Sequence, residues 1–399
     1  MTTINSIADL RERARRRVPR AIFEYADRGA YDEITLARNR RDLDAIEFRQ
    51  RVMVDLTQMS LAGTMLGEAV ALPLAIGPTG LAGLFHGDGE IHGARAAKQF
   101  GIPFTLSTMS ICSIEDVRAA VKQPFWFQLY LMRDRGFNQE LIDRSKAAHC
   151  SALMLTVDMP VQGLRRRDAK NGLSIPPRLT WRNVLDIASK PNWAFGVLTG
   201  QRRTFGNLAT HLNTNAKLST LSQWIASQFD PSVTWRDLEW VRNQWPGKLI
   251  VKGILDPEDA LAATQLGADA VVVSNHGGRQ LDGAPSSISA LPRIAAAIQD
   301  RCEVWFDGGI LSGQDIVKAL SLGASACLIG KAFLYALAAG GESGVTLALE
   351  ILRREMEITL ALTGCTDVRH TGRSLLNSNG FFESAETSHA PQAPRPCHA

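Results

Sequence analysis

The stretch AVVVSNHGGRQLD, residues 270–282, joins a clear strand signal to a clear polar cluster. Its first four residues are an apolar run of strand length bounded by polar residues, which is typical of a buried parallel strand. His276 and Arg279 follow this strand, with Gly277 and Gly278 between them. Glycines at this point allow a sharp turn and the close approach of a flat group. A proton acceptor and a fixed cation at one strand end predict a site that polarises or oxidises a small anion.

Strand-length apolar segments recur along the chain, and most are separated by a segment with helical spacing. With residues 270–274, the candidates are 72–77, 103–106, 125–130, 152–157, 248–252, 303–307 and 326–330. Helix starts are marked by Asp256 before Pro257 and by Ser113 with Asp116 three residues later. Eight alternating units predict an α/β protein with a closed parallel (β/α)8 TIM barrel. A doubly wound open sheet is the structural alternative, but the GxGxxG that it would want after an early strand is missing.

Three regions fall outside the regular repeat. Residues 1–71 are expected to form a helical and strand cap that closes the bottom of the barrel, which itself spans residues 72–383. Residues 168–245 form a long insertion after the fourth strand, rich in Trp, Phe, Asn and Pro, including Pro176 and Pro177. An excursion of this length on the loop side is expected to be a lid or binding loop. The tail at 384–399, rich in Ser, Ala, Pro and His, is expected to be disordered.

The composition is that of an ordinary soluble globular protein. The 399 residues are 45% hydrophobic and 21% charged, and a net charge of +4 makes no case for nucleic acid. The six cysteines form no CxxC pair, so we expect buried thiols of a reducing, cytosolic compartment and no metal site. We find no signal-peptide pattern and no apolar run approaching the ~18 residues of a spanning helix. The basic run at 11–20 is expected to be a solvated helix face, with an anionic or membrane surface as the alternative.

Polar or glycine residues follow every predicted strand, at the end where barrels of this class carry their chemistry. They are Thr79, Gly80, Ser107, Gln128, Tyr130, Thr156, Asp158, Lys252, Ser274, His276, Asp307, Gly308, Gly309, Gly330 and Lys331. The glycines after the last two strands expose backbone N–H groups that suit a phosphate. Donors on the earlier strands suit the edge of a flat heterocycle, and Lys252 could stabilise its anionic reduced form. The combination points to flavin mononucleotide (FMN).

The segment at 274–282 closely resembles the active-site signature of the FMN-dependent L-2-hydroxy acid dehydrogenase and oxidase family, which acts on lactate, mandelate and glycolate. The likeness runs from about Ile4 to Leu376. It also covers FEYA at 23–26, GPTG at 77–80, FQLY at 127–130, LTVD at 155–158, VKG at 251–253 and DGG at 307–309. The resemblance therefore implies the same barrel, FMN as cofactor and a small 2-hydroxy carboxylate as substrate.

The resemblance also implies a role for each matching residue. His276 takes the substrate hydroxyl proton and is oriented by Asp158. The substrate carboxylate is bound by Arg165, Arg279 and Tyr25, with Tyr130 nearby. The isoalloxazine ring meets Thr79, Gly80, Ser107, Gln128, Thr156, Lys252 and Ser274. The ribityl phosphate is held by Asp307, Gly308, Gly309, Gly330 and Lys331.

Three positions bear on how far the resemblance carries. Leu311 and Lys331 stand where the family usually has arginines near the phosphate. Lysine lacks the bidentate geometry of arginine, so we expect FMN to be held more loosely than is typical. Gly80 stands where many oxidases of the family have alanine, which favours a dehydrogenase that passes electrons to a quinone or other carrier.

The expected reaction is FMN-dependent oxidation of an L-2-hydroxy acid, lactate first, to the 2-oxo acid. His276 is the base and hydride goes to flavin N5; a carbanion route would use the same residues. The alternatives are oxidation of mandelate, an oxidase activity that uses oxygen, and oxidation of a modified peptide in cofactor biosynthesis. A flavin-dependent isomerase and a non-catalytic flavin-binding role are further alternatives.

The electron acceptors to consider are a quinone, a cytochrome or O2. The resemblance implies a homotetramer, cytoplasmic or peripheral at the inner membrane face, where aromatic and basic residues at 181–205 would make contact.

Overall fold

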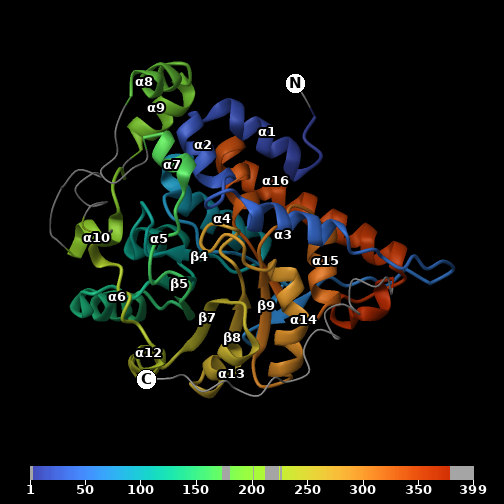
Figure 1. The fold of residues 1–399 in the computed structure, drawn as a ribbon. Coiled ribbons are helices and arrows are strands. Elements are labelled where there is room, and N and C mark those ends of the chain that lie inside the picture. Colours follow the sequence, from blue (N-terminus) through green and yellow to red (C-terminus); the bar gives the residue numbers. More distant parts are fainter. Residues whose placement is uncertain (1–2, 173–179, 201, 212–223, 225–226, 378–399) are drawn as a thin grey trace.

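The computed structural model describes residues 3–172, 180–200, 202–211, 224 and 227–377 (Figure 1). Eight parallel strands form one sheet in the order β3-β10-β9-β8-β7-β6-β5-β4. They are β3 (Leu74–Ile76), β4 (Thr105–Ser107), β5 (Trp126–Leu129), β6 (Ala152–Thr156), β7 (Lys248–Ile254), β8 (Ala270–Val273), β9 (Glu303–Asp307) and β10 (Ala326–Ile329). A parallel bridge between Ile76 and Phe104 joins β3 to β4 and completes the ring. The predicted TIM barrel is confirmed, and each strand lies within a few residues of its predicted place.

One helix follows each barrel strand. In chain order these are α4 (Gly89–Phe100), α5 (Ile114–Val121), α6 (Arg135–Ala147), α12 (Trp235–Gln244), α13 (Pro257–Gln265), α14 (Ser287–Ile298), α15 (Gly313–Ser321) and α16 (Lys331–Thr363). The two predicted start signals are confirmed. Ser113 and Asp116 form a capping box at α5, and the side chain of Asp256 caps α13 in front of Pro257.

The amino end of the barrel is closed by a small hairpin, β1 (Gly63–Met65) with β2 (Glu68–Val70). Met65 and Val70 pack in a buried cluster with Trp126 and Trp305, whose rings stack at 5.1 Å. The N–H of Leu66 donates to the carboxylate of Glu303 at 2.7 Å. The expectation that residues 1–71 close the bottom therefore holds only for this hairpin.

The helices of the N-terminal region lie elsewhere and must be described separately: α1 (Ile7–Arg17), α2 (Arg20–Asp27) and α3 (Ile34–Asp44). α1 packs along α16, and α3 packs against α14 (Figure 1). The N–H of Ala30 donates to the carbonyl of Gly278 at 2.9 Å, and that of Thr35 to the carboxylate of Asp282 at 2.8 Å. The segment from Ala30 to α3 thus docks on the signature loop, at the carboxyl ends of the strands, where that loop supplies partners for its backbone groups.

The insertion between β6 and β7 is largely helical where it is described. It contains α7 (Arg166–Lys170), α8 (Trp181–Ala188), α9 (Pro191–Thr199) and α10 (Gly206–His211), while α12 belongs to the barrel repeat. α8 packs against α9 and α2, and the two helices project beside α1 and α2 (Figure 1). Pro176, Pro177, Cys397 and the expected disordered tail at 384–399 lie outside the described residues.

The long helix α16 corrects the expectation that no apolar run approaches a membrane span. By length and composition it could cross a bilayer, but 72% of its most apolar window is buried inside the protein. It packs against α1, α4 and α15. Gly340 and Gly341 depart from helical geometry and kink it near the middle. Burial of this kind is typical of the core helix of a barrel rather than of a lipid-facing one.

Candidate active site

A cavity of about 560 Å³ opens at the carboxyl ends of the barrel strands. Most of the predicted site residues line it: Tyr25, Thr79, Gly80, Ser107, Tyr130, Arg165, Lys252, His276, Arg279, Asp307, Gly308, Gly309, Gly330 and Lys331. The remaining four do not line it. Gln128, Asp158 and Ser274 are hydrogen-bonded to residues that do, namely Ser107, His276 and Lys252, and Thr156 pairs with Lys252 between adjacent strands. The cavity therefore brings together residues from both ends of the chain.

The signature loop turns sharply because three consecutive residues adopt left-handed backbone conformations. His276, Gly277 and Gly278 have φ angles of 58°, 64° and 72°. At Gly278 a side chain is excluded, since a methyl group there would lie 2.6 Å from the backbone nitrogen of Leu36. The loop is fixed by a reciprocal amide pair between Asn275 and Asn39, at 2.7 and 2.8 Å. This buried pair holds His276 at the edge of the cavity, where it is a rare non-glycine residue with positive φ.

Behind the cavity wall, Nδ1 of His276 lies 3.0 Å from Oδ1 of Asp158. Asp158 fits there because β7 bulges between Lys252 and Ile254, and Gly253 in the bulge has no side chain. A methyl group on Gly253 would lie 2.6 Å from Cγ of Asp158. With Nδ1 bound to the carboxylate, Nε2 is the nitrogen of His276 left to act on a group in the cavity.

The electrostatics of this pair suit a general base. Burial lowers the pKa of His276 below its ordinary value, although the charge of Asp158 works in the opposite direction. Burial alone would raise the pKa of Asp158, but the charge of His276 and its hydrogen bond bring that pKa below the usual range. At neutral pH the pair therefore consists of a neutral imidazole and a carboxylate, and the carboxylate stabilises the imidazolium that forms on proton uptake.

The floor of the cavity carries a charged triad from three adjacent strands. Nζ of Lys252 lies 2.9 Å from the carboxylate of Asp307 and donates to Oγ of Ser274 at 3.0 Å. Ser274 in turn donates to the same carboxylate at 2.6 Å. Burial opposes the charge of Lys252, but Asp307 and Asp158 outweigh it and raise the pKa of this lysine. Lys252 is therefore a permanent cation at the base of the site.

Two buried polar atoms beside the cavity test whether a flavin fits. Gln128 accepts a hydrogen bond from Oγ of Ser107 at 3.0 Å through its Oε1. The Nε2 of Gln128 and the Oγ1 of Thr156, in contrast, have no hydrogen-bond partner among the described residues. Unsatisfied buried donors and acceptors are costly, and they are found where a ligand supplies the partner. A flat heterocycle with ring nitrogens and carbonyls would satisfy both atoms, so the donor set fits the isoalloxazine of FMN.

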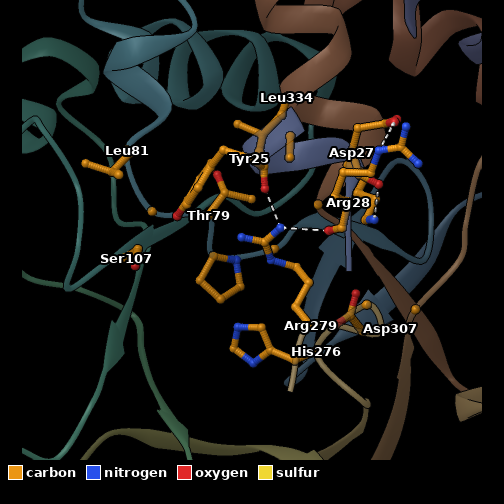
Figure 2. Close-up of a pocket in the computed structure, with 18 of the residues that line it drawn as sticks. Tyr25, Asp27, Arg28, Thr79, Leu81, Ser107, His276, Arg279, Asp307 and Leu334 are labelled. Carbon is orange, nitrogen blue, oxygen red and sulfur yellow. Dashed lines mark hydrogen bonds and ion pairs between the residues drawn. The ribbon is translucent and has the colours of Figure 1, made fainter. Parts of the chain in front are cut away.

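The opposite side of the cavity presents two guanidiniums. Arg279 donates to the main-chain carbonyls of Tyr25 and Arg28, and its guanidinium lies 4.8 Å above the ring of Tyr25 (Figure 2). Nε of Arg165 donates to the carbonyl of Arg279 at 3.4 Å. Within the described part of the chain, neither guanidinium is in an ion pair. Burial, reinforced by the charge of Arg165, lowers the pKa of Arg279 to about 10. Two guanidiniums that line one cavity and are not neutralised form a site for an anion.

Figure 2 shows the relative positions of the His276 imidazole, the Arg279 guanidinium and the Tyr25 phenol. The side chain of Arg279 extends past His276 toward Tyr25, and all three point into the same space. Tyr130 lines the cavity as well, and burial raises the pKa of its hydroxyl, which stays protonated and can donate. An anion held by the guanidiniums would therefore have its neighbouring atoms close to Nε2 of His276.

The sequence reasoning gave no site role to several cavity residues, among them Met159, Gln162, Asp168, Phe205 and Phe229. Asp168 could have been found, since it lies one helical turn after Arg165 on the short helix α7. Burial raises the pKa of its carboxyl, and the charges of Arg279 and Arg165 work against that rise. Phe205 and Phe229 come from the insertion, and no local pattern connects them to the cavity.

The residues that the structure describes contain no group of three or more His, Cys, Asp or Glu side chains that could hold a metal ion. Cys112, Cys150, Cys302, Cys327 and Cys365 are free thiols. Burial raises the pKa of Cys150 to about 12, so this thiol stays protonated and unreactive.

Comparison with known proteins adds three findings. A family model described as FMN-dependent dehydrogenase matches residues 14–378. An L-lactate dehydrogenase of Caulobacter vibrioides strain NA1000 is 50% identical over 374 residues, or 94% of this chain and 97% of that protein. An L-lactate dehydrogenase of Acinetobacter baylyi is 47% identical, over 96% of this chain and 100% of that protein.

Solved structures give the same picture in three dimensions. The monotopic membrane protein (S)-mandelate dehydrogenase superposes with a TM-score of 0.90 at 37% identity, covering 95% of this chain and 100% of that chain. A mandelate oxidase superposes with a TM-score of 0.79 at 38% identity, covering 94% and 98% respectively.

Proposed function

The chain belongs to the FMN-dependent dehydrogenase family, and we propose that it oxidises the hydroxyl group of an L-2-hydroxy acid to the corresponding 2-oxo acid. The observation that carries this proposal is the convergence of His276, Arg279 and Tyr25 on one cavity, with Asp158 bonded behind the imidazole. An alcohol oxidation needs a base for the hydroxyl proton and an acceptor for the carbon-bound hydrogen. The cavity offers the first from the chain itself and room for the second.

Substrate orientation follows from the two guanidiniums. Arg165 and Arg279 would bind the carboxylate of the substrate, and the Tyr25 hydroxyl would add a hydrogen bond. Arginine keeps its charge and grips a carboxylate with two parallel hydrogen bonds, which fixes the direction of the bound acid. Holding the C2 carbon in one orientation is mainly an entropic contribution to rate.

Proton removal would fall to His276. Its Nε2 would accept the proton of the C2 hydroxyl, and Asp158 would stabilise the imidazolium that results. FMN, when bound, accepts the hydrogen and the electron pair of the C2–H bond. Lys252 at the floor of the cavity would favour negative charge on the reduced heterocycle. Gln128, Thr156, Ser107 and Ser274 would hold its edge, while the glycine amides after β9 and β10 and Lys331 would hold the phosphate.

L-Lactate is the first substrate to test, because the curated relatives at 45–50% identity are L-lactate dehydrogenases. A larger 2-hydroxy acid such as mandelate is the second candidate, favoured by one specific observation. Leu81, Met109, Phe205 and Phe229 give the cavity an apolar wall larger than a methyl side chain needs. An apolar wall of this kind binds the aryl side chain of a substrate well, but it discriminates only weakly against substrates with a smaller side chain.

Electron transfer to a membrane quinone is the proposed second half-reaction. The exposed face of α8 and α9 carries Trp181, Val184, Leu185 and Phe195, whose exposed fractions range from 54% to 72%. Basic residues of α1 lie beside it, since Lys190 donates to the carbonyl of Arg16 at 2.7 Å. Apolar residues next to arginines suit an interfacial contact with anionic lipid. We therefore propose peripheral association with the inner face of the cytoplasmic membrane, and assembly as a homotetramer as in the expected family pattern.

The proposal is tested by mixing the FMN-loaded protein anaerobically with a panel of L-2-hydroxy acids. Bleaching of the oxidised flavin band at about 450 nm identifies the substrate. Subsequent admission of air or of a soluble quinone separates an oxidase from a dehydrogenase. A loaded protein that no 2-hydroxy acid bleaches would refute the proposed reaction.

A further inference from the structure

Four cationic side chains line the cavity besides the groups assigned to the substrate and the flavin ring. They come from four elements: Arg11 (α1), Arg28 (after α2), Arg40 (α3) and Lys331 (α16). Three of them are already in ion pairs with carboxylates: Arg11 with Asp27 at 2.6 Å, Arg28 with Glu33 at 3.3 Å, and Arg40 with Asp315 at 2.7 Å. Lys331 differs. Among the described residues it has no ion pair, and its ammonium donates to the main-chain carbonyl of Asp27 at 2.9 Å.

Lys331 also stands where a phosphate would meet the barrel. It is the first residue of α16, after Gly330, and its side chain passes beside Gly277 of the signature loop. Across the same end of the cavity, Leu311 contributes an apolar side chain. The ends of β9 and β10 therefore present backbone amides to a phosphate dianion, together with Lys331, a cation without a carboxylate partner among the described residues.

We propose that Lys331 recognises the FMN phosphate by taking up a proton from solvent when the cofactor binds, so that FMN affinity falls as pH rises while riboflavin affinity does not. This inference rests on the FMN-binding function proposed above. It concerns this chain in particular, because a permanently charged arginine at this position would bind phosphate without exchanging a proton.

The groups around Lys331 explain why its ammonium can lose its proton near neutral pH. Burial lowers its pKa most, and Arg279 of the signature loop and Arg11 of α1 lower it further. Asp27 of α2 and Glu33 before α3 oppose them, and the net result is a pKa of about 7. The Asp27 carboxylate cannot compensate fully because it already accepts from Arg11 at 2.6 Å and from the Tyr335 hydroxyl at 2.7 Å.

A bound phosphate reverses this balance. A phosphomonoester has a second pKa near ~6, so it is a dianion above neutral pH. A dianion beside the ammonium favours the charged form and raises the pKa of Lys331 in the complex. Below pH ~7 the lysine already carries its proton and binding exchanges little. Above that pH, binding takes up one proton, and the dissociation constant of FMN rises by up to about tenfold per pH unit.

The experiment compares FMN with riboflavin, which has the same ring but no phosphate. Flavin is removed from the full-length protein, and each flavin is titrated back while its fluorescence is followed. Between about pH 7 and pH 8.5 we expect the dissociation constant of FMN to rise about 15-fold and that of riboflavin to stay constant. Calorimetry at about pH 8 in two buffers of different ionisation enthalpy should count close to one proton taken up per FMN and none per riboflavin.

Two variants and a matched control sharpen the test. Lys331→Arg should bind FMN with no pH dependence in this window, and Lys331→Met should lose the preference for FMN over riboflavin near neutral pH. Lys98→Arg serves as the control, because Lys98 also donates to a main-chain carbonyl, that of Val121 at 2.9 Å, but does not line the cavity. It should keep the profile of the natural protein.

The outcomes separate cleanly. Parallel pH profiles for FMN and riboflavin, or an unchanged slope in Lys331→Arg, would overturn the proton-uptake proposal while leaving the FMN function intact. Folded protein that binds neither flavin at any pH would contradict the proposed function itself, and this inference with it. Riboflavin binding by every variant confirms that the ring site is folded.

Discussion

Nδ1 of His276 lies 3.0 Å from Oδ1 of Asp158, and the two residues meet because Gly253, in a bulge of the strand between them, leaves room for the carboxylate. This relationship fixes which nitrogen of the imidazole can act as a base. It also sets the protonation state of the pair, since burial and charge act on the two residues in opposite directions.

The first prediction concerns the pH dependence that this pair imposes. The pKa of His276 lies below its ordinary value, so the base is protonated and inactive only in acid, and kcat/KM should rise with pH and level off before neutrality. Asp158→Asn removes the group that raises this pKa, so the acid limb should move to lower pH. His276→Ala should slow flavin bleaching by about 10²–10⁴-fold, the usual contribution of a general base, without releasing flavin. Rapid-mixing absorbance measures both; bleaching by His276→Ala at the rate of the natural protein would remove this residue as the base.

The second prediction separates substrate binding from chemistry. Arg279→Lys keeps a charge but loses the two-pronged grip on a carboxylate, and a hydrogen bond to a charged group contributes about 1.5–3 kcal/mol. We therefore expect KM for the hydroxy acid to rise about 10- to 150-fold, and a similar rise for Arg165→Met. Arg182→Lys on the exposed helix α8 is the control and should leave KM unchanged. Equal KM values for the three variants would argue against a carboxylate site between Arg165 and Arg279.

The third prediction concerns the buried amide pair that fixes the signature loop. Asn39→Ala deprives the amide of Asn275 of its partner, and an unsatisfied buried group costs about 1–3 kcal/mol. Urea unfolding should report that loss, together with slower flavin reduction, because His276 is the next residue in the loop. Gln139→Ala removes an exposed amide that bonds to Asp143 at 3.1 Å, and it should change stability by less than about 0.5 kcal/mol. An Asn39→Ala protein with unchanged stability and normal kinetics would show that the signature loop keeps its conformation without the amide pair.

The fourth prediction tests membrane association. Replacing both Leu185 and Phe195 by Glu puts two charges on the apolar face of α8 and α9, where they should abolish sedimentation with anionic phospholipid vesicles. Activity with a soluble dye as acceptor should stay normal, because neither residue lines the cavity. Ile358→Glu and Leu362→Glu, on an exposed face of α16, form the matched control and should leave sedimentation intact. Loss of sedimentation in the control instead would assign membrane contact to α16.

The fifth prediction concerns retention of FMN. With one titratable cation at the phosphate end, we expect the natural protein to lose part of its FMN during extensive dialysis at about pH 8. Leu311→Arg adds a permanent cation and should tighten binding about tenfold or more. Leu362→Arg adds the same charge on the surface of α16 and should not. Complete retention of flavin by the natural protein would contradict the expectation of a loose phosphate site.

Much of this architecture could be predicted from the sequence because its signals are local. Each barrel strand is a short apolar run that is buried on both faces, and the helix caps at Ser113 and Asp256 are contained within a few residues. The polar residues after the strands could be assigned to one site because parallel strands bring their carboxyl ends to the same side. The barrel predicted from these signals is confirmed, and so are the family and its cofactor, which the resemblance at residues 274–282 implied.

What escaped prediction depends on contacts between distant residues. Asn39 and Asn275 are 236 positions apart, and nothing near either residue marks the amide pair. Phe205 and Phe229 reach the cavity through an insertion whose helices follow no repeat. The N-terminal helices were expected at the wrong end of the barrel because their composition fits either end. Contacts with residues far along the chain determine where they dock, such as the packing of α1 on α16 and the hydrogen bond from Ala30 to the Gly278 carbonyl.

The proximity of α2 to the first turn of α16 has a consequence for biosynthesis. Tyr25 emerges from the ribosome early and Lys331 very late, yet Lys331 donates to a carbonyl of the same helix that carries Tyr25. A nascent chain cannot assemble this pocket until nearly all of it has been translated. Premature termination anywhere before β10 would therefore yield polypeptides that lack part of the cofactor site. Such truncated chains would not bind the cofactor and so would not transfer electrons.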